Sequence, residues 1–373
     1  MLMHLSYWEI SAWFESVDFT IVGSGIVGLN CALALREKFP ESKILVLERG
    51  ILPSGASTKN AGFACFGSIS EIVEDLKNHS EEEVFQLVKK RINGLNLLRK
   101  TLGDQSIGFK QWGGHELFLS KESKLFEECL EAVPRINTLL KPLFKESVYY
   151  KNHNSFNFQN IIKNYVSTFF EGQIDTGKMM QALVKKAIKK DILIVNSASV
   201  TSFSELKNGV ALEINNNFEF QTHKLLFATN GFANQLLNED IKPARAQVLI
   251  TKPINGLQIK GTFHLDKGFY YFRNINNRIL LGGGRNLDFQ KEETTNFGLT
   301  DIIQNQLETF LKEVILPNQK FEIEHRWSGI MGVGNKKKPV VKQISESVFC
   351  GIRLGGMGVA IGSEIGKDLA ELI

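Results

Sequence analysis

The stretch Phe19-Thr-Ile-Val-Gly-Ser-Gly-Ile-Val-Gly28 decides the fold of this chain. A β-branched run, typical of a buried strand, breaks there into the glycines Gly23, Gly25 and Gly28. Gly23 allows a tight turn, Gly25 lets backbone N–H groups approach a pyrophosphate, and Gly28 permits close packing of a helix on the strand. The stretch therefore predicts a strand, a turn and a helix that bind a dinucleotide, the alternative being a glycine-rich turn that binds nothing.

The residues that follow complete this pattern. Apolar residues recur at helical spacing over 26–35, and a second buried strand, Lys43-Ile-Leu-Val-Leu47, ends on Glu48. The start of the helix offers its positive dipole end to phosphates. Glu48 lies 20 residues beyond Gly28, the separation at which a carboxylate at a strand end accepts hydrogen bonds from ribose hydroxyls.

Length and composition exclude several other classes of protein. A chain of 373 residues predicts two lobes, and 44 basic against 40 acidic side chains argue against nucleic-acid binding as the main activity. The one basic cluster, Lys336-Lys-Lys338, reads as a solvated turn. Four widely spaced cysteines form no CxxC pair, which favours a reducing compartment and predicts no metal site.

The N-terminal residues 1–16 are apolar and aromatic, but they carry Glu9 and Glu15 and no basic region, so they make a poor secretory signal. We interpret them as an amphipathic extension that packs on the body, with contact to a membrane surface as the alternative. No apolar run reaches the roughly 20 residues that span a bilayer. We therefore expect a soluble, cytoplasmic protein without a transmembrane segment.

The rest of the chain alternates between segments with helical periodicity and segments with the pattern of strands. We expect helices over 71–102, over 121–140 with Pro142 as the stop, over 179–190 with Asp175 as the cap, and over 301–314. Three short alternating segments, 199–203, 210–214 and 218–221, predict a β-meander, and a buried strand over 224–228 follows it. This order, which ends in Ala228-Thr-Asn-Gly231, is typical of flavin-type rather than plain NAD domains.

Several further motifs carry a family resemblance over nearly the whole chain. They are Ser54-Gly-Ala-Ser-Thr-Lys-Asn-Ala-Gly62, Tyr270-Tyr271 ahead of Arg278-Ile-Leu-Leu-Gly-Gly, Arg326-Trp-Ser-Gly329, and Arg353-Leu-Gly-Gly-Met-Gly-Val-Ala-Ile-Gly362. With the fingerprint, Glu48 and Ala228–Gly231, they make the chain resemble the FAD-dependent D-amino-acid oxidase superfamily. Within it, the chain is similar to the branch of glycine oxidase, sarcosine oxidase and γ-glutamylputrescine oxidoreductase-like proteins.

The resemblance implies a fold of class α/β plus α+β. A Rossmann-type FAD-binding domain, with a parallel sheet and a β-meander, would comprise residues 17–75, 165–240 and 330–373. An interleaved substrate domain on a mainly antiparallel sheet would comprise 76–164 and 241–329. The cofactor would be FAD, held without a covalent bond because no cysteine stands near Met331, where the family places one.

The resemblance also assigns cofactor-binding residues. They come from the fingerprint, from the end of the second strand, from the 54–64 loop, from the meander and the strand after it, and from the terminal glycine cluster. The full set is Gly23, Ser24, Gly25, Ile26, Gly28, Glu48, Arg49, Ser57, Thr58, Asn60, Ala61, Gly62, Phe63, Ala64, Val200, Ala228, Thr229, Gly231, Arg353, Gly355, Gly356, Met357, Gly358 and Val359.

On the substrate side, Tyr271 matches a tyrosine that lines the active site in this branch, the alternative being an aromatic packed in the sheet. The family's two carboxylate-binding arginines fall on Met331 and Gly356, so a free α-amino acid substrate is in question. The oxygen-activating lysine of sarcosine oxidase falls on Leu280. The candidates to replace or join these groups are Arg273, Arg285, Arg326, His115 and Lys59, each of which also has a structural alternative.

The resulting hypothesis is an FAD-dependent oxidoreductase that removes a hydride from the carbon of a primary or secondary amine, or of an amino-acid derivative, to flavin N5, with hydrolysis of the imine. The alternatives are a flavin dehydrogenase of a 2-hydroxy acid or polyol, and a flavin-binding subunit of a heteromeric amine dehydrogenase. Substrate identity, the electron acceptor and the choice between a homodimer and a partner subunit stay open.

Overall fold

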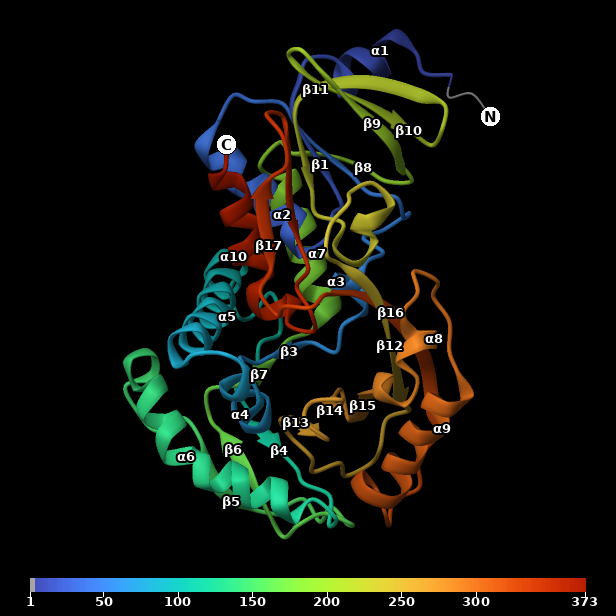
Figure 1. Cartoon of the computed structure of the whole chain (residues 1–373). Coiled ribbons are helices and arrows are strands. Elements are labelled where there is room, and N and C mark those ends of the chain that lie inside the picture. The colour runs from blue at the N-terminus through green and yellow to red at the C-terminus, as the bar shows by residue number, and fades with distance from the viewer. Residues whose placement is uncertain (1–3) are drawn as a thin grey trace.

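The computed structural model describes residues 4–373, and Figure 1 shows two lobes joined by long strands. The sheet of the upper lobe has the order β17 (Val340–Gln343), β18 (Val348–Ile352), β11 (Phe218–Phe227), β1 (Val17–Val22), β2 (Ile44–Leu47), β8 (Leu193–Val195). Strands β10 (Gly209–Ile214) and β9 (Val200–Leu206) extend from β11 as a meander. The central strands pair in parallel and are buried, as expected of strands covered on both faces.

Helices cover one face of this sheet. They are α2 (Ile26–Lys38), α7 (Thr176–Ile188) and α10 (Gly358–Glu371), whose apolar residues form one core with β1 and β2. Asp175 caps α7, as predicted, by accepting a hydrogen bond from the Lys178 N–H at 3.0 Å. The meander packs on the other face, where β9, β10 and β11 share a second core with β1 and β2.

The lower lobe has its own sheet, ordered β16 (Ile323–Val333), β12 (Lys242–Thr251), β15 (Arg278–Gly283), β14 (Tyr270–Ile275), β13 (Thr262–Leu265), β4 (Gly114–Glu116), β6 (Asn164–Thr168), β5 (Tyr150–His153). It is antiparallel except where β4 pairs with β13. Helix α9 (Asp301–Phe310) and the π-helical turn η4 (Leu311–Ile315) cover its outer face. Its inner face meets the 61–63 segment of the upper lobe. These two sheets confirm the predicted fold class.

Short elements lie between the two sheets along the chain. They are α3 (Ala56–Lys59), β3 (Phe63–Ala64), β7 (Gly172–Gln173) and η2 (Asn230–Gln235). Two others, η3 (Arg285–Leu287) and α8 (Phe289–Glu292), connect β15 to α9 within the lower lobe. The predicted domain limits stay a prediction. Strand β6 lies, except for Asn164, within the 165–240 segment that was assigned to the FAD-binding domain, but it is hydrogen-bonded between β4 and β5 of the lower sheet.

Helices α4 (Ile69–Asn78), α5 (Glu81–Leu102) and α6 (Ser123–Phe144) depart from the sequence pattern in two places. The predicted 71–102 helix is two helices, α4 and α5, because Ser80 and Glu83 form a capping box that starts the second. Helix α6 runs through Pro142, so the predicted stop there is wrong. Buried Ile136 and Leu140 pack against α4 residues, and this packing outweighs the hydrogen bond that the proline removes.

The strands also differ from the prediction. The third meander segment and the strand expected after it are one continuous strand, β11. Thr222 lies opposite Val210 of β10 and opposite Val17 of β1, so β11 changes partners there without a break. Strands β13 and β17 were not expected, because four-residue segments are too short to show a period.

The N-terminal extension is described from residue 4, and residues 1–3 of the predicted 1–16 segment lie outside the described residues. It forms α1 (Tyr7–Glu9) and a π-helical turn η1 (Ile10–Phe14). Phe14 is buried against Phe218 and Phe220, with ring centroids 4.8 and 5.2 Å away, whereas Trp8 is exposed. Among the described residues, no helix is both long enough and apolar enough to cross a membrane.

Candidate active site

The segments predicted to bind the cofactor meet at one edge of the upper sheet. Gly23–Gly28 follow β1, Glu48–Arg49 follow β2, 228–231 follow β11, and 353–359 follow β18. These four strands are parallel, so their carboxyl ends lie at the same edge. This is the edge where ligands bind in open α/β sheets.

The first turn at this edge and the start of the helix after it require glycine at two positions, Gly23 and Gly28. Gly23 has a φ of +105°, and a Cβ there would lie 2.9 Å from the Ala228 carbonyl oxygen. A Cβ on Gly28 would lie 1.9 Å from the Gly23 carbonyl oxygen. The backbone of the turn is therefore pressed between β11 and α2, as the fingerprint predicts.

Glu48 is a buried carboxylate with a full set of donors. Its Oε2 accepts hydrogen bonds from the Ser24 N–H (3.2 Å) and hydroxyl (2.7 Å). Its Oε1 accepts from the Gly50 N–H and the Ser54 hydroxyl, both at 2.9 Å. The two hydroxyls are the partners that can rotate away, so they mark the positions at which hydroxyls of a ribose can replace them.

The 54–64 loop divides its polar side chains between two tasks. The Ser57 hydroxyl accepts from the Ile26 N–H at 3.0 Å, at the start of α2. Thr58 and Asn60 instead bond within the loop and to α7: Thr58 donates to the Pro53 carbonyl (2.7 Å), and Asn60 Oδ1 accepts from the Gly62 N–H (2.8 Å). Ser57 is therefore the loop side chain placed at a helix N-terminus, where anions bind.

The C-terminal glycine cluster leaves space at the same edge. A Cβ on Gly355 or Gly358 would meet no atom within 4 Å, and one on Gly356 would meet only Met331 Sδ at 4.0 Å. The side chain at the N-cap of α10, Met357, makes no capping hydrogen bond. Nearby in the same edge, the Thr229 hydroxyl is buried and has no partner among the described residues. This part of the edge thus combines free space with unused donors.

Three other members of the predicted set are engaged elsewhere in the fold. The Arg353 side chain points away from the glycines, to the Lys338 carbonyl (3.0 and 3.1 Å) and to Asp240 (2.8 Å). The Val200 side chain is buried in the meander core. Gly231 packs on β16, where a Cβ would lie 2.4 Å from the Met331 carbonyl oxygen.

On the lower lobe, Tyr271 lies on the inner face of the sheet. Its ring is 5.6 Å from the Phe63 ring, at 77°, and it shares a small cluster with Ala61 and Trp327. The ring covers Gly282 of β15, since a Cβ there would lie 2.7 Å from it. Burial raises the pKa of Tyr271 to about 12, so the phenol is neutral. The structure thus brings Tyr271 to the 61–63 segment.

The other predicted substrate-side residues do not join Tyr271. Arg273 shares its face, but its guanidinium donates to the carbonyls of Ala61 and, at 2.9 Å, Ile174. Arg326 lies on the outer face, where it pairs with Glu308 of α9 at 2.6 Å. His115 also faces outward, stacked on Phe263 with its Nδ1 2.8 Å from the Ser167 hydroxyl. Alternate residues of a strand face opposite sides of a sheet, and the sequence did not show which set faces inward. Arg326 and His115 belong to the outward-facing sets of their strands.

The two remaining candidates lie beside aromatic rings. The Arg285 guanidinium stacks on Phe289 at 4.7 Å, and the Lys59 ammonium lies 5.0 Å from the centre of the Phe297 ring. Burial lowers the pKa of His115 to about 4 and leaves it neutral. Of the six substrate-side residues that the sequence suggested, only Tyr271 therefore presents an unengaged polar group on the inner face, since no hydrogen bond to its hydroxyl occurs among the described residues.

Sequence reasoning missed a buried acid and histidine on this same face. His264 lies opposite Tyr271 in the β13–β14 register, and its ring is 5.2 Å from Phe63. Its Nε2 has no hydrogen bond among the described residues and lies 3.9 Å from Glu171 Oε2. Glu171 Oε1 accepts from the Phe66 N–H at 3.1 Å. The alternation of β13 would reveal His264 once its pairing with Tyr271 was known, but Glu171 is an isolated loop residue without a sequence signal.

Stability should reflect this buried acid. Burial raises the pKa of Glu171 from 4.5 to about 8, so the folded chain keeps a proton that the unfolded chain has lost. The free energy of unfolding then falls as pH rises between these values, by up to roughly 1.4 kcal/mol per unit. We expect Glu171→Gln to match the parent near pH 5 and to be more stable near pH 8 in denaturant unfolding.

An exposed acid supplies the control for that measurement. Glu131→Gln, on the exposed side of α6, should leave the pH profile of the parent unchanged. Parallel profiles for Glu171→Gln and the parent would show that Glu171 is ionised in the fold at neutral pH.

Comparisons with known proteins agree with this architecture. The model of the family described as FAD dependent oxidoreductase matches residues 18–372. "Probable oxidoreductase OrdL" of Haemophilus influenzae is 22% identical over 96% of this chain and 83% of its own length. Glycine oxidase from Geobacillus kaustophilus superposes with a TM-score of 0.75 at 17% identity, over 95% of this chain and 94% of that one. Iminodiacetate oxidase from Chelativorans sp. BNC1 gives 0.76 at 16% identity and the same coverage.

The parallel sheet, its glycine-lined edge and the second sheet facing it define a flavin-dependent oxidoreductase. The chain belongs to the FAD dependent oxidoreductase family, and its cofactor is FAD. The edge fits this group on its own evidence: free space at Gly355 and Gly358, a buried Thr229 hydroxyl without a partner, and a Glu48 carboxylate whose two hydroxyl partners can be replaced. Which residues contact FAD stays a prediction.

Proposed function

We propose that this enzyme oxidises the C–N bond of a primary or secondary amine, or of an amino-acid derivative, that is not held by an arginine clamp on a carboxylate. The observation that carries the proposal is the inner face of the lower sheet. It presents the neutral Tyr271 phenol and the buried His264, while Arg273 on the same face is engaged by two backbone carbonyls. Glycine oxidase and iminodiacetate oxidase, two of the similar structures, are named for amine-bearing substrates.

The proposed roles follow the geometry of the edge. Gly23–Gly28 and Ser57 would hold the pyrophosphate, Glu48 the ribose, and the 353–359 segment the flavin end. FAD, when bound, supplies a two-electron acceptor for the hydride of the carbon that carries the amine. The 17–75, 165–240 and 330–373 segments would form the FAD-binding domain, apart from strand β6, which pairs in the lower sheet, and 76–164 with 241–329 the substrate domain.

The chain's own residues would orient the amine and exclude water from it. Tyr271 can donate its unengaged hydroxyl to the substrate, and Phe63 and Trp327 enclose the same cluster in apolar surface. Burial lowers the pKa of His264, so it is neutral and can accept a proton at Nε2. An amine that binds uncharged needs no further base, and water hydrolyses the released imine.

An anaerobic screen tests the proposal. The purified holoprotein is mixed with primary amines, secondary amines, amino acids, 2-hydroxy acids and polyols, and the flavin absorbance is followed. Bleaching by an amine with release of ammonia or of an aldehyde supports the proposal. Bleaching only by 2-hydroxy acids or polyols, or none until a partner subunit is added, would overturn it in favour of those two alternatives. A repeat in air shows whether oxygen reoxidises the flavin.

Moving the Tyr271 ring should slow the reaction. A methyl group on Gly282 would lie within 2.8 Å of the Tyr271 ring and hydroxyl, so Gly282→Ala forces the ring to turn. We expect flavin reduction by the amine found in the screen to slow roughly tenfold, about 1.4 kcal/mol in the barrier. Stopped-flow absorbance measures the rate, and the FAD content should not change. Tyr271→Phe, which keeps the ring, is the companion variant, and unchanged rates in both would remove Tyr271 from the site.

A further inference from the structure

A loop of the lower lobe reaches the cofactor edge of the upper one. Residues 293–300 connect α8 to α9, and we call them the 293–300 loop. It forms one wall of an open hollow of about 690 Å³ with Thr295, Asn296 and Phe297. The opposite wall comes from the upper lobe, with Arg49, Ser54 and Ser199.

The upper wall belongs to the predicted nucleotide site. Ser54 donates its hydroxyl to Glu48 at 2.9 Å, so the hollow opens beside the carboxylate proposed to hold the ribose. Arg49 follows Glu48 directly, and Ser199 precedes Val200, a predicted cofactor-binding residue. The hollow therefore lies at the adenosine end of the edge, away from Tyr271.

Phe297 presents a partly exposed ring toward this end. It is 45% exposed and lines the hollow, so part of the ring is available for contact. Its ring lies 6.4 Å from Phe232, and the Arg49 guanidinium stacks on Phe232 at 3.6 Å. A row of one cation and two aromatic rings offers the stacking surfaces that a planar heteroaromatic base requires.

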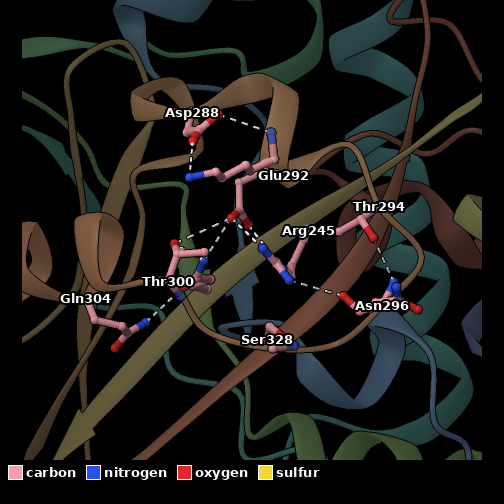
Figure 2. Close-up of polar contacts among 11 residues, drawn as sticks. Arg245, Asp288, Glu292, Thr294, Asn296, Thr300, Gln304 and Ser328 are labelled. Carbon is pink, nitrogen blue, oxygen red and sulfur yellow. Dashed lines mark hydrogen bonds and ion pairs between the residues drawn. The ribbon is translucent and has the colours of Figure 1, made fainter.

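A buried ion pair fixes the loop. Figure 2 shows Glu292, at the start of the loop, between Arg245 and Thr300. Glu292 is completely buried and accepts two hydrogen bonds from Arg245, at 2.8 and 2.7 Å, and one from Gln247 at 3.1 Å. At the far side, the Gly298 N–H donates to Ser328 at 3.0 Å. The loop is therefore anchored at both ends rather than draped over the surface.

We propose that the 293–300 loop clasps the adenosine end of FAD, with Phe297 packed against the adenine and Asn296 beside it. The substrate lobe thereby contributes to cofactor binding. The inference rests on the FAD-dependent function proposed above, but it concerns a part of the cofactor remote from the reacting atoms. Loss of the clasp changes how tightly FAD and ADP bind.

Binding measurements on the apoprotein test the clasp. The variants are Phe297→Ala and the milder Phe297→Leu, with Leu299→Ala as the matched control, because Leu299 is an exposed residue of the same loop outside the hollow. The ligands are FAD, ADP and riboflavin, which lacks the adenosine. We expect Phe297→Ala to weaken FAD and ADP roughly tenfold, with riboflavin unaffected and Leu299→Ala like the parent.

Each other outcome overturns the clasp. Equal FAD and ADP affinities for Phe297→Ala and the parent, with equal melting temperatures, would show that Phe297 does not contact the adenine. Equal losses in Leu299→Ala would show a general effect of the loop. If Phe297→Ala does not fold, Phe297→Leu decides by the same criteria. Failure of the parent to bind FAD would overturn the proposed function itself, whereas FAD binding without amine oxidation would overturn only the proposed reaction.

Discussion

Replacing Gly358 by leucine should abolish FAD binding and leave the fold intact. A Cβ on Gly358 meets no protein atom within 4 Å, so the larger side chain enters free space and costs the apoprotein little. If the flavin end of FAD uses that space beside the start of α10, the leucine takes its place. We expect affinity to fall at least roughly a hundredfold, about 2.7 kcal/mol. Flavin absorbance after gel filtration and a titration of apoprotein with FAD measure the loss.

A second bulky substitution on the same helix supplies the control. Lys367→Leu places an equal side chain on the exposed side of α10 and should retain FAD as the parent does. Thermal melts of both apoproteins should agree within a few degrees. Full FAD binding by Gly358→Leu would place the flavin elsewhere and remove the 353–359 segment from the proposed site.

Among the substitutions proposed for this chain, replacing Arg245 by methionine should cause the largest fall in the free energy of unfolding. Arg245 supplies two of the hydrogen bonds to Glu292, whose side chain is fully buried. Without it, Glu292 keeps hydrogen bonds from Gln247 and Thr300, and its charge loses the cation that it directly contacts. Breaking a buried pair in this way costs about 3–5 kcal/mol. Urea unfolding of the apoprotein, followed by far-ultraviolet circular dichroism, measures the change.

The double variant separates the charge from the packing. Arg245→Met with Glu292→Leu removes both charges, so it should recover much of the stability that Arg245→Met loses. Lys242→Met is the matched control, because Lys242 makes an exposed ion pair with Glu293 on the same two segments. A double variant no more stable than Arg245→Met would show that the loss comes from packing rather than from the unpaired carboxylate.

The upper lobe could be predicted in detail because each of its signals is local. The fingerprint, the buried strand before Glu48 and the Asp175 cap lie within a few residues of the structures they specify. The partners of β11 were harder, since one strand changes neighbours at Thr222 and sequence shows no break at such a point. Pro142 misled the prediction because tertiary packing, which local rules omit, keeps α6 helical.

The cofactor side of the candidate site has local sequence signals, whereas the substrate side has few. The predicted cofactor contacts lie at glycine-rich turns, which the sequence marks. Substrate-side roles depend on which face of a strand a side chain occupies. Arg326 and His115 lie on the outer face and His264 on the inner one, a difference of one residue in register. Arg273 has the expected face, but its partners Ala61 and Ile174 are distant in sequence.

The hydrogen bonds that Arg273 makes between the two lobes bear on how the enzyme admits its substrate. This guanidinium crosses from the lower sheet to two carbonyls of the upper lobe and is almost completely enclosed. Swinging the lobes apart would break the two hydrogen bonds of this guanidinium and expose the apolar cluster of Ala61, Val248 and Leu280 to water. Passage of small molecules should therefore rely on local rearrangement of side chains or surface turns, while the two halves of the molecule stay clamped throughout turnover.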